Sequence, residues 1–571
     1  MNRHVTLLWL LLLAAVPMAS TAQSPDANHN LEVGKSLDIF NSLYSNLDLL
    51  YVDTLNPTTT MTAAIDGMLR SLDPYTEYYP ADDTKNLKMM LTGKYAGIGA
   101  LVKYHSRLKR VVIDEPYEGM PAQEVGLMKG DIIVSIDDSL MTDKNVSYVS
   151  SHLRGDAGTT FMLKVLRPQS DGTEKEMKFK ITRRNIKLPD MPYYGMGSDS
   201  IGYINFNQFT EGSAKEVRRA FIELKKQGAR GMVLDLRSNG GGAEIEAVDL
   251  VNIWVPQEQT VVENRGKIRQ ASRIYTTRLE PVDTVMPLVV LVNGETASAS
   301  EITSGALQDL DRAVVMGTRT YGKGLVQVPM DLPYNTNVKI TTSKYYIPSG
   351  RCIQAINYAK RRETGADNRS SRGGSLYGER TPDSLTHVFY TRNGRVVRDG
   401  GGIKPDVEVK NDTMPNIAYY LSTGGMDSTE VLFDYVVSYI ERHPQIAPAK
   451  EFHITDEDWQ EFRQRVIASG FTYDDLSRKQ FDELVKTAKY EGYYEEARDA
   501  FDALKQRLHH DLSTELDKHR DAIQELIELD IISAYHYQAG AIAAGLAYDK
   551  VYQEAVRLLK NTEEYAKILQ P

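Results

Sequence analysis

The segment that decides the fold is P-L-V-V-L-V-N-G-E-T-A-S-A-S-E-I-T-S-G-A-L-Q-D-L, residues 287–310. Its continuous apolar run from 288 to 292 is typical of a strand that is covered on both faces. The run ends at Asn293-Gly294, and a helix is expected to begin within the small residues 296–300. A serine at such a junction points its hydroxyl toward the edge of the sheet, close to helix N–H groups that stabilise negative charge. The segment predicts a covered sheet with a polar site where this strand ends.

Two other segments show a similar pattern on either side of this one. D-L-R-S-N-G-G-G (235–242) ends an apolar run with three glycines, which free backbone N–H groups to face a ligand oxygen, as an oxyanion hole requires. T-Y-G-K-G-L-V-Q (320–327) follows the apolar run 313–316 and places Lys323 between two glycines, where the backbone can approach another segment closely. Spacing alone favours an exposed loop lysine at this position.

Composition limits the class of protein. At about 150 residues per domain, 571 residues predict about four modules. Hydrophobic residues make up 42% and charged residues 25%, the balance of a globular protein with real cores. A net charge of −10 and a pI near 5.7 argue against nucleic acid as the main partner. The single cysteine, Cys352, excludes an internal disulfide and a cysteine-based zinc site, and H-E-x-x-H is missing, so we expect no metal and no cofactor.

The first residues indicate export. Arg3 and His4 precede an apolar run over 5–16, which is shorter than the about 20 residues that span a bilayer, and small residues follow over 19–22. This pattern predicts a signal peptide at 1–22 that is cleaved after Ala22, with cleavage after Ala19 as the competing site. An uncleaved amphipathic anchor is the alternative.

The rest of the chain divides by hydrophobic pattern. Helical spacing marks both ends, short β-type runs separated by glycine turns come second, and strands alternate with helices in the middle. Thr455 begins a T-x-x-D cap before a helix that Gly470 is expected to end. The expected regions are an N-terminal helical region at 23–92, a β-rich domain at 93–184, an α/β core at 185–426 with a polar, flexible insertion near 359–400, and a C-terminal helical region at 427–571.

Together these segments resemble the C-terminal processing peptidases, also called tail-specific proteases, of bacteria and chloroplasts. The resemblance covers roughly 72–410, and the strings occur in the order of that family, which makes the match specific although each string alone is modest. The matching strings are L-D-P-Y-T-E-Y (72–78), Y-A-G-I-G-A (95–100), P-A-Q-E-V-G-L-M-K-G-D-I-I-V-S-I-D (121–137), L-R-G-D-A-G-T (153–159), D-L-R-S-N-G-G-G (235–242), T-A-S-A-S-E-I (296–302), Y-G-K-G-L-V-Q (321–327), Y-I-P-S-G-R (346–351) and G-I-K-P-D-V (402–407).

The resemblance implies a multidomain α/β protein, with a mixed, crotonase-like protease core, an inserted PDZ domain at 93–184 and flanking α-helical regions. It implies that Ser298 is the nucleophile and that Ser300 and Ser304 are the nearby alternatives. It also implies that Lys323 is the general base and that Gln327 orients this lysine, although a plain strand residue is the alternative for Gln327. The oxyanion hole would then be the N–H of Ala299 with one from Gly242 or Gly241.

The chemistry of these residues is compatible with those roles. A lysine base must lose its charge. To lower its pKa from about 10.4 to about 7, the surroundings must disfavour the charged form by about 4.6 kcal/mol. Burial among apolar groups such as Leu325 and Val326 is expected to supply that cost, and a Ser–Lys pair is a known form of nucleophile plus base.

In the PDZ-like region, the turn Gly97-Ile98-Gly99 can present successive N–H groups to the terminal carboxylate of a peptide that adds to a strand edge. A purely structural role for these glycines is the alternative.

The predicted function is that of an exported, periplasmic Ser–Lys endopeptidase that selects protein substrates by their C-termini. A homo-oligomer or an adaptor protein is a further expected partner through the helical regions. A non-catalytic peptide-binding scaffold or chaperone is the alternative, disfavoured by the intact Ser298, Lys323 and Gln327. A lipid- or retinoid-binding protein on the same sheet is a third hypothesis, which the PDZ insertion disfavours.

Overall fold

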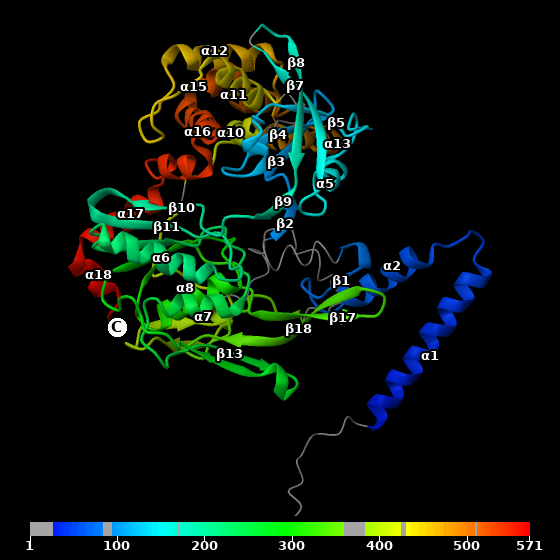
Figure 1. Cartoon of the computed structure of the whole chain (residues 1–571), viewed down its shortest axis with the longest axis vertical. Coiled ribbons are helices and arrows are strands. Elements are labelled where there is room, and N and C mark those ends of the chain that lie inside the picture. Colours follow the sequence, from blue (N-terminus) through cyan, green and yellow to red (C-terminus); the bar gives the residue numbers. More distant parts are fainter. Residues whose placement is uncertain are drawn as a thin grey trace, which may run out of the picture. The chain divides into compact units, whose positions relative to one another are not determined.

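The computed structural model describes residues 27–83, 94–169, 171–358, 383–410, 412–423, 430–473, 476–508 and 511–571 (Figure 1). It separates into two compact units, Met1–Leu69 and Arg70–Pro571. The expected signal peptide and residues 359–382 of the expected insertion lie outside the described residues.

The first unit consists of helices α1 (Ala27–Leu50) and α2 (Pro57–Arg70), in the region where helical spacing was expected. The Tyr44 hydroxyl in α1 donates to the Pro57 carbonyl at 3.3 Å. Many apolar side chains of α1 are exposed, Leu37 and Ile39 among them. Within the described residues, no helix is long and apolar enough to cross a membrane.

The PDZ region is built on a six-stranded antiparallel sheet with the order β3-β4-β5-β7-β8, in which β6 pairs with β5. Helices α4 (Pro121–Glu124) and α5 (Val146–Leu153) complete it, and its apolar core includes Ile98, Ile113 and Leu163. A separate ribbon of β2 and β9 connects this region at both ends. The strands are β2 (Lys94–Gly97), β3 (Ala100–His105), β4 (Arg110–Pro116), β5 (Ile132–Ile136), β6 (Ser139–Leu140), β7 (Thr160–Pro168), β8 (Glu174–Thr182) and β9 (Arg184–Lys187).

The protease core contains a six-stranded sheet in which the strands follow one another in chain order. All neighbours are parallel except β10, which pairs antiparallel with β11. Strands β12 and β15 are fully buried, as their continuous apolar runs predicted. The strands are β10 (Tyr193–Met196), β11 (Ile201–Asn205), β12 (Gly231–Asp235), β15 (Leu288–Val292), β16 (Val314–Gly317) and β21 (Val407–Glu408).

Helices cover both faces of this sheet. Helices α6 (Ser213–Lys226), α7 (Glu244–Val251) and α8 (Ala299–Asp309) pack on one face. The other face is covered by α17 (Lys550–Lys560) and α18 (Thr562–Ile568), from the far end of the chain (Figure 1). The two-sided cover predicted from the apolar strands is therefore present, but its second layer comes from the C-terminal helical region.

A second sheet carries the lysine segment. Its order is β1-β18-β13-β14, and β17 (Leu325–Leu332) pairs antiparallel with β18 (Thr336–Tyr346). Strand β1 (Glu77–Tyr79) pairs with the other edge of β18, and Tyr75, which precedes β1 in the string 72–78, contacts Lys323. The other strands are β13 (Thr260–Gly266) and β14 (Arg273–Thr276), and β19 (Val388–Tyr390) and β20 (Val396–Arg398) form a small separate hairpin.

Most of the remaining helices form a bundle with its own core, and α13 and α14 pack against each other around a separate small core. Thr455 and Asp458 form the expected capping box before α12, and Gly470 follows that helix with a φ of +71°. Ion pairs of Lys103 with Glu430 (2.7 Å) and Lys129 with Asp530 (2.9 Å) join this bundle to the PDZ region. The helices are α10 (Asn416–Thr423), α11 (Val431–Arg442), α12 (Asp456–Ala468), α13 (Leu476–Glu491), α14 (Arg498–Leu508), α15 (Leu512–Lys518) and α16 (Arg520–Gly545).

Candidate active site

Ser298 lies between the end of β15 and the first residue of α8, as the junction pattern predicted. Its backbone has φ 57° and ψ −117°, a conformation that a residue with a side chain rarely adopts and that costs on the order of 1–3 kcal/mol. The residues around it from 299 to 309 are buried, whereas Ser298 is partly exposed. The strained turn therefore presents one hydroxyl at the carboxyl-terminal edge of the parallel strands.

The two alternative serines are engaged elsewhere. Ser300 and Ser304 are completely buried. The Ser300 hydroxyl donates to the Asn239 carbonyl at 2.9 Å, and the Ser304 hydroxyl donates to the Ser300 carbonyl at 2.8 Å. Of the three serines, Ser298 is the one that a substrate can reach.

Lys323 is partly buried just before β17, and not the exposed loop lysine that spacing alone favoured. Its ammonium nitrogen lies 4.7 Å from the centre of the Tyr75 ring. Burial lowers the pKa of Lys323 to about 8, assisted by the charge of Lys339 and opposed by Glu301 and Asp73. A pKa near neutrality is the property that a lysine base needs.

Glu301 contacts both predicted residues, although the predictions from the sequence did not include it. Its carboxylate is completely buried and accepts four hydrogen bonds. Oε2 accepts the backbone N–H of Ser298 and of Lys323, both at 2.9 Å. Oε1 accepts the Gly322 N–H at 2.8 Å and the Thr320 hydroxyl at 2.5 Å. One carboxylate thus ties the serine turn to the lysine loop. Its position three residues after Ser298, where a capping-box acid stands, was the signal available in the sequence.

Side-chain contact between the three predicted catalytic residues is not part of this arrangement. Among the described residues, the Lys323 amine forms no hydrogen bond with Ser298 or Gln327. The Gln327 amide instead donates to the Thr341 hydroxyl at 3.1 Å. The buried Tyr345 hydroxyl lies 2.6 Å from the Lys323 carbonyl and 3.2 Å from that of Ser298. The backbones of Ser298 and Lys323 are held together, but among the described residues no side-chain hydrogen bond yet provides a path for the proton.

The glycine run lies against the serine turn. A side chain on Gly241 would begin 2.8 Å from both the Ala299 nitrogen and the Ser298 Cβ, so only glycine fits there. The Gly241 N–H already donates to the Asn239 side chain at 2.9 Å. The N–H groups of Gly242 and Ala299 donate to none of the described residues. Of the two predicted glycines, Gly242 therefore has the N–H that is available for an oxyanion.

The turn predicted to bind a terminal carboxylate joins β2 to β3. Gly97 ends β2, the Ile98 carbonyl accepts the Ala122 N–H, and the Gly99 carbonyl accepts the Tyr117 N–H, both at 2.9 Å. In the part of the chain that the structure describes, the N–H groups of Ile98 and Gly99 have no acceptor. The turn is fixed through its carbonyls, and its N–H groups remain available.

A cavity of about 590 Å³ lies beside the lysine strand. Leu72, Leu325 and Tyr358 give it apolar walls, and Thr341, the partner of Gln327, also lines it. No three His, Cys, Asp or Glu side chains of the described residues are grouped so that they could hold a metal ion.

Three family descriptions match the chain. Peptidase family S41 matches residues 200–359, a PDZ domain matches 112–167, and the C-terminal helical domain of a probable PDZ-protease matches 420–559. Together with the fold and the accessible serine, these matches define a serine-type peptidase that carries a PDZ domain.

Curated relatives narrow this class. The chain is 33% identical to the carboxy-terminal-processing protease of Bartonella bacilliformis over 339 residues, which are 59% of this chain and 76% of that protein. It is 36% identical to the carboxyl-terminal-processing protease of Synechocystis over 297 residues, 51% of this chain and 68% of that one. The chain is also similar to a solved structure of a photosystem II D1 C-terminal processing protease, with 26% identity and a TM-score of 0.36. That match covers 67% of this chain and 93% of the solved chain. The chain belongs to the carboxy-terminal-processing protease family.

This membership confirms the family, the fold class and the enzyme class predicted from the sequence. The two non-catalytic hypotheses, a scaffold or chaperone and a lipid- or retinoid-binding protein, are not supported.

Proposed function

We propose that the protein is an exported endopeptidase in which Ser298 is the nucleophile and Lys323 the general base. The observation that carries this proposal is the single buried carboxylate of Glu301, which accepts the backbone N–H of both residues. A lysine with a pKa of about 8 is partly unprotonated near neutral pH, so it can accept a proton from serine.

In the acylation step, Ser298 Oγ attacks the scissile carbonyl carbon and its proton passes to Lys323 Nζ. The carbonyl oxygen becomes an oxyanion that accepts the N–H groups of Ala299 and Gly242. When the C–N bond breaks, Lys323 returns the proton to the leaving amine and an acyl-enzyme remains. Gln327 orients the lysine through its amide oxygen, because its amide nitrogen is engaged by Thr341.

In the deacylation step, a water molecule attacks the ester carbonyl carbon and gives a proton to Lys323 Nζ. The ester C–O bond then breaks, the proton returns to Ser298 Oγ, and the peptide leaves with a new C-terminal carboxyl group. The lysine thus serves as base and acid in turn in both halves of the reaction.

Substrates are selected through the PDZ domain, which matches a family of peptide-binding modules. The N–H groups of Ile98 and Gly99 would bind the terminal carboxylate, with Gly97 ending the strand before them. The peptide would then pair with the edge of β3, beside α5.

The place of action and the partners are part of the same proposal. The positive start, short apolar run and small residues at 1–22 direct the chain to the periplasm, after cleavage of a signal peptide. Homo-oligomer or adaptor contacts would use the helical regions, where α1 exposes apolar side chains.

The test uses purified protein and peptides that differ at their C-termini, with cleavage followed by mass spectrometry. Ser298→Ala should abolish cleavage and leave the fold intact, because it removes one hydroxyl from a turn. Ser300→Ala is the matched control and should remain active if the protein folds. Activity of Ser298→Ala above about a thousandth of the wild-type rate would place the nucleophile elsewhere.

A further inference from the structure

An ion pair joins the protease sheet to the C-terminal helical region beside the glycine run. Arg237 follows the end of β12, and its side chain is 15% exposed. One of its terminal nitrogens donates to Asp549 Oδ1 at 3.0 Å and the other to Asp549 Oδ2. Both carboxylate oxygens of Asp549 are therefore engaged by one guanidinium group, the geometry that binds a carboxylate most firmly.

The same guanidinium group is also held by Asp235. Arg237 Nε lies 2.9 Å and 3.1 Å from the two Asp235 oxygens, and a terminal nitrogen lies 2.5 Å from Oδ2. The Tyr203 hydroxyl and the Arg237 backbone N–H also donate to Asp235, at 2.8 Å and 3.0 Å. Two carboxylates from distant parts of the chain thus fix one guanidinium group in place.

Asp549 is itself held rigidly. It is the N-cap of α17, and its Oδ1 accepts the backbone N–H of Val551 and Tyr552, both at 3.0 Å. The helix behind it is packed on the protease sheet, where Val551 and Tyr552 are buried. The Asp549 carboxylate is therefore fixed relative to the sheet independently of its contact with Arg237.

The loop that begins at Arg237 leads directly into the oxyanion glycines. Its next residue, Ser238, has a φ of +57° and is held by Asn293. The Asn239 carbonyl accepts the Ala297 N–H at 3.0 Å and the Ser300 hydroxyl at 2.9 Å. The middle of the loop is thus anchored to the serine turn, and its start is anchored by Arg237.

We propose that Asp549 is a positioning residue for proteolysis. Through Arg237 it fixes the start of the loop 237–242, and so it sets where the Gly242 N–H meets the oxyanion. The C-terminal helical region then contributes to the geometry of the catalytic site. This inference rests on the proposed function, because that function assigns the Gly242 N–H to the oxyanion hole.

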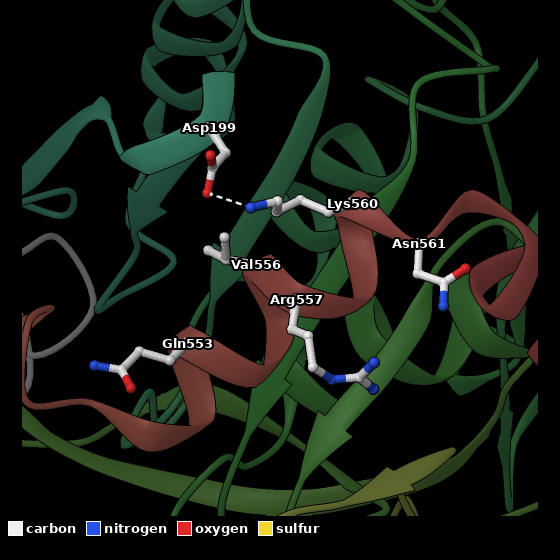
Figure 2. A pocket seen from close by; sticks show the side chains of 6 residues that line it. All are labelled: Asp199, Gln553, Val556, Arg557, Lys560 and Asn561. Carbon is white, nitrogen blue, oxygen red and sulfur yellow. Dashed lines mark hydrogen bonds and ion pairs between the residues drawn. The ribbon is translucent and has the colours of Figure 1, made fainter.

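The same helix offers a matched control. At its other end, Lys560 pairs with Asp199 at 3.0 Å and ties α17 to a short turn, Ser198–Ser200, before β11 (Figure 2). These side chains are 55% and 43% exposed. Lys560→Ala therefore removes an ion pair between α17 and the protease core but leaves the loop 237–242 untouched.

The test compares Asp549→Ser with Lys560→Ala in the full chain. Serine keeps a helix cap but cannot accept both Arg237 nitrogens. We expect kcat to fall about 10- to 100-fold in Asp549→Ser, less than the about 100- to 1,000-fold that follows deletion of an oxyanion donor. KM should change less than about threefold, and Lys560→Ala should keep wild-type kcat within about twofold.

A second measurement separates positioning from general loss of structure. Ser298 Oγ adds to the carbonyl carbon of a peptide aldehyde, its proton passes to Lys323 Nζ, and the former carbonyl oxygen becomes an oxyanion in the hole. The corresponding peptide alcohol has no carbonyl group and binds without an oxyanion. Asp549→Ser should weaken aldehyde inhibition by the same factor as kcat and leave binding of the peptide alcohol unchanged. Asp549→Asn keeps the cap and the shape, and it should show a smaller loss in the same direction.

The outcomes are distinct. If kcat and aldehyde inhibition in both Asp549 variants equal those of Lys560→Ala, Asp549 has no positioning role. If inhibition by the aldehyde and binding of the alcohol weaken by equal factors, Asp549 acts on structure alone and the inference fails. If the aldehyde does not inhibit the wild type, or Ser298→Ala still cleaves, the proposed function is wrong, and this inference, which depends on it, is wrong as well.

Discussion

Glu301 Oε2 accepts the backbone N–H of Lys323 at 2.9 Å, although 22 residues separate the two in the chain. The same oxygen accepts the N–H of Ser298. A completely buried carboxylate with four donors around it is costly to place and costly to disturb. The relative position of the proposed nucleophile and the proposed base is therefore set by one side chain that need not touch the substrate.

Replacement of Glu301 by glutamine should expose this dependence. The amide has one acceptor oxygen in place of two, so its NH2 group faces two of the four donors. A buried unsatisfied donor costs about 1–3 kcal/mol, so kcat/KM should fall about 10- to 100-fold. The measurement is steady-state cleavage of one peptide, with Glu295→Gln, at an exposed position in the same turn, as the control. Equal rates for the two variants would contradict the role of the carboxylate.

The pH dependence should have two parts. Lys323 acts as a base only when it is unprotonated, so activity should rise with pH through about 8. Burial raises the pKa of Glu301 to about 7, partly offset by the Thr320 hydroxyl and the N–H groups around it. Because both groups gain protons below pH 7, log kcat/KM should change with a slope near two there and near one between 7 and 8. In Glu301→Gln the steeper limb should disappear, and a flat profile from pH 5.5 to 9.5 would remove lysine from the base role.

Lys323→Met should be inactive but more stable than the wild type. The ordinary lysine pKa of 10.5 applies in the unfolded chain, and the folded protein lowers it to about 8. The unfolded state therefore binds more protons between pH 8 and 10.5, and below pH 8 the charged lysine costs the folded state about 3–4 kcal/mol. Methionine removes this cost, so its gain should be full below pH 8 and vanish by about pH 10.5. Denaturant unfolding at pH 6.5 and 10.5 measures it, with Lys344→Met, an exposed neighbour on β18, showing no such gain.

Lys323→Arg should be as inactive as Lys323→Ala. A guanidinium group stays protonated in proteins and cannot accept a proton from serine. Gln327→Ala should retain more activity than either, because it disorients the base without removing it. Single-turnover cleavage rates of the three variants at pH 8.5 provide the comparison, and a working arginine variant would overturn the assignment.

Recognition of the substrate end should depend on charge. Amidation of the C-terminus removes the carboxylate that the Ile98 and Gly99 N–H groups are proposed to bind, but it leaves the scissile bond unchanged. Cleavage of the amidated peptide should be slower, and this difference should disappear when residues 97–184 are deleted. Equal cleavage of both peptides by the intact protein would leave the glycine turn with a structural role.

The local parts of the site were predictable from the sequence, and the long-range parts were not. The apolar run and the small residues around Ser298 predict a strand, a turn and a helix, because each depends on neighbours in the chain. The burial of Lys323 depends on Tyr75, which lies far away in the sequence, so spacing alone favoured an exposed residue. Only the family resemblance indicated a role for it.

The long-range contacts of Glu301 and Asp549 were likewise not predictable from the sequence. The capping position of Glu301 is visible in the sequence, but two of its backbone donors belong to the lysine loop. Asp549 is recognisable as a helix cap, yet nothing in the pattern indicates that its carboxylate reaches Arg237. The placement of α17 on the protease sheet is a matter of tertiary packing, which hydrophobic periodicity does not encode.

The position of α17 also sets an order of events as the chain is made. Strands β11, β12, β15 and β16 leave the ribosome long before the residues of α17 and α18, and until then one apolar face of their sheet has no cover. Arg237 likewise lacks its partner Asp549 until that part of the chain has been made. We expect the growing chain to have little proteolytic activity until α17 and α18 are in place, so that synthesis itself delays the enzyme and protects neighbouring chains from early cleavage.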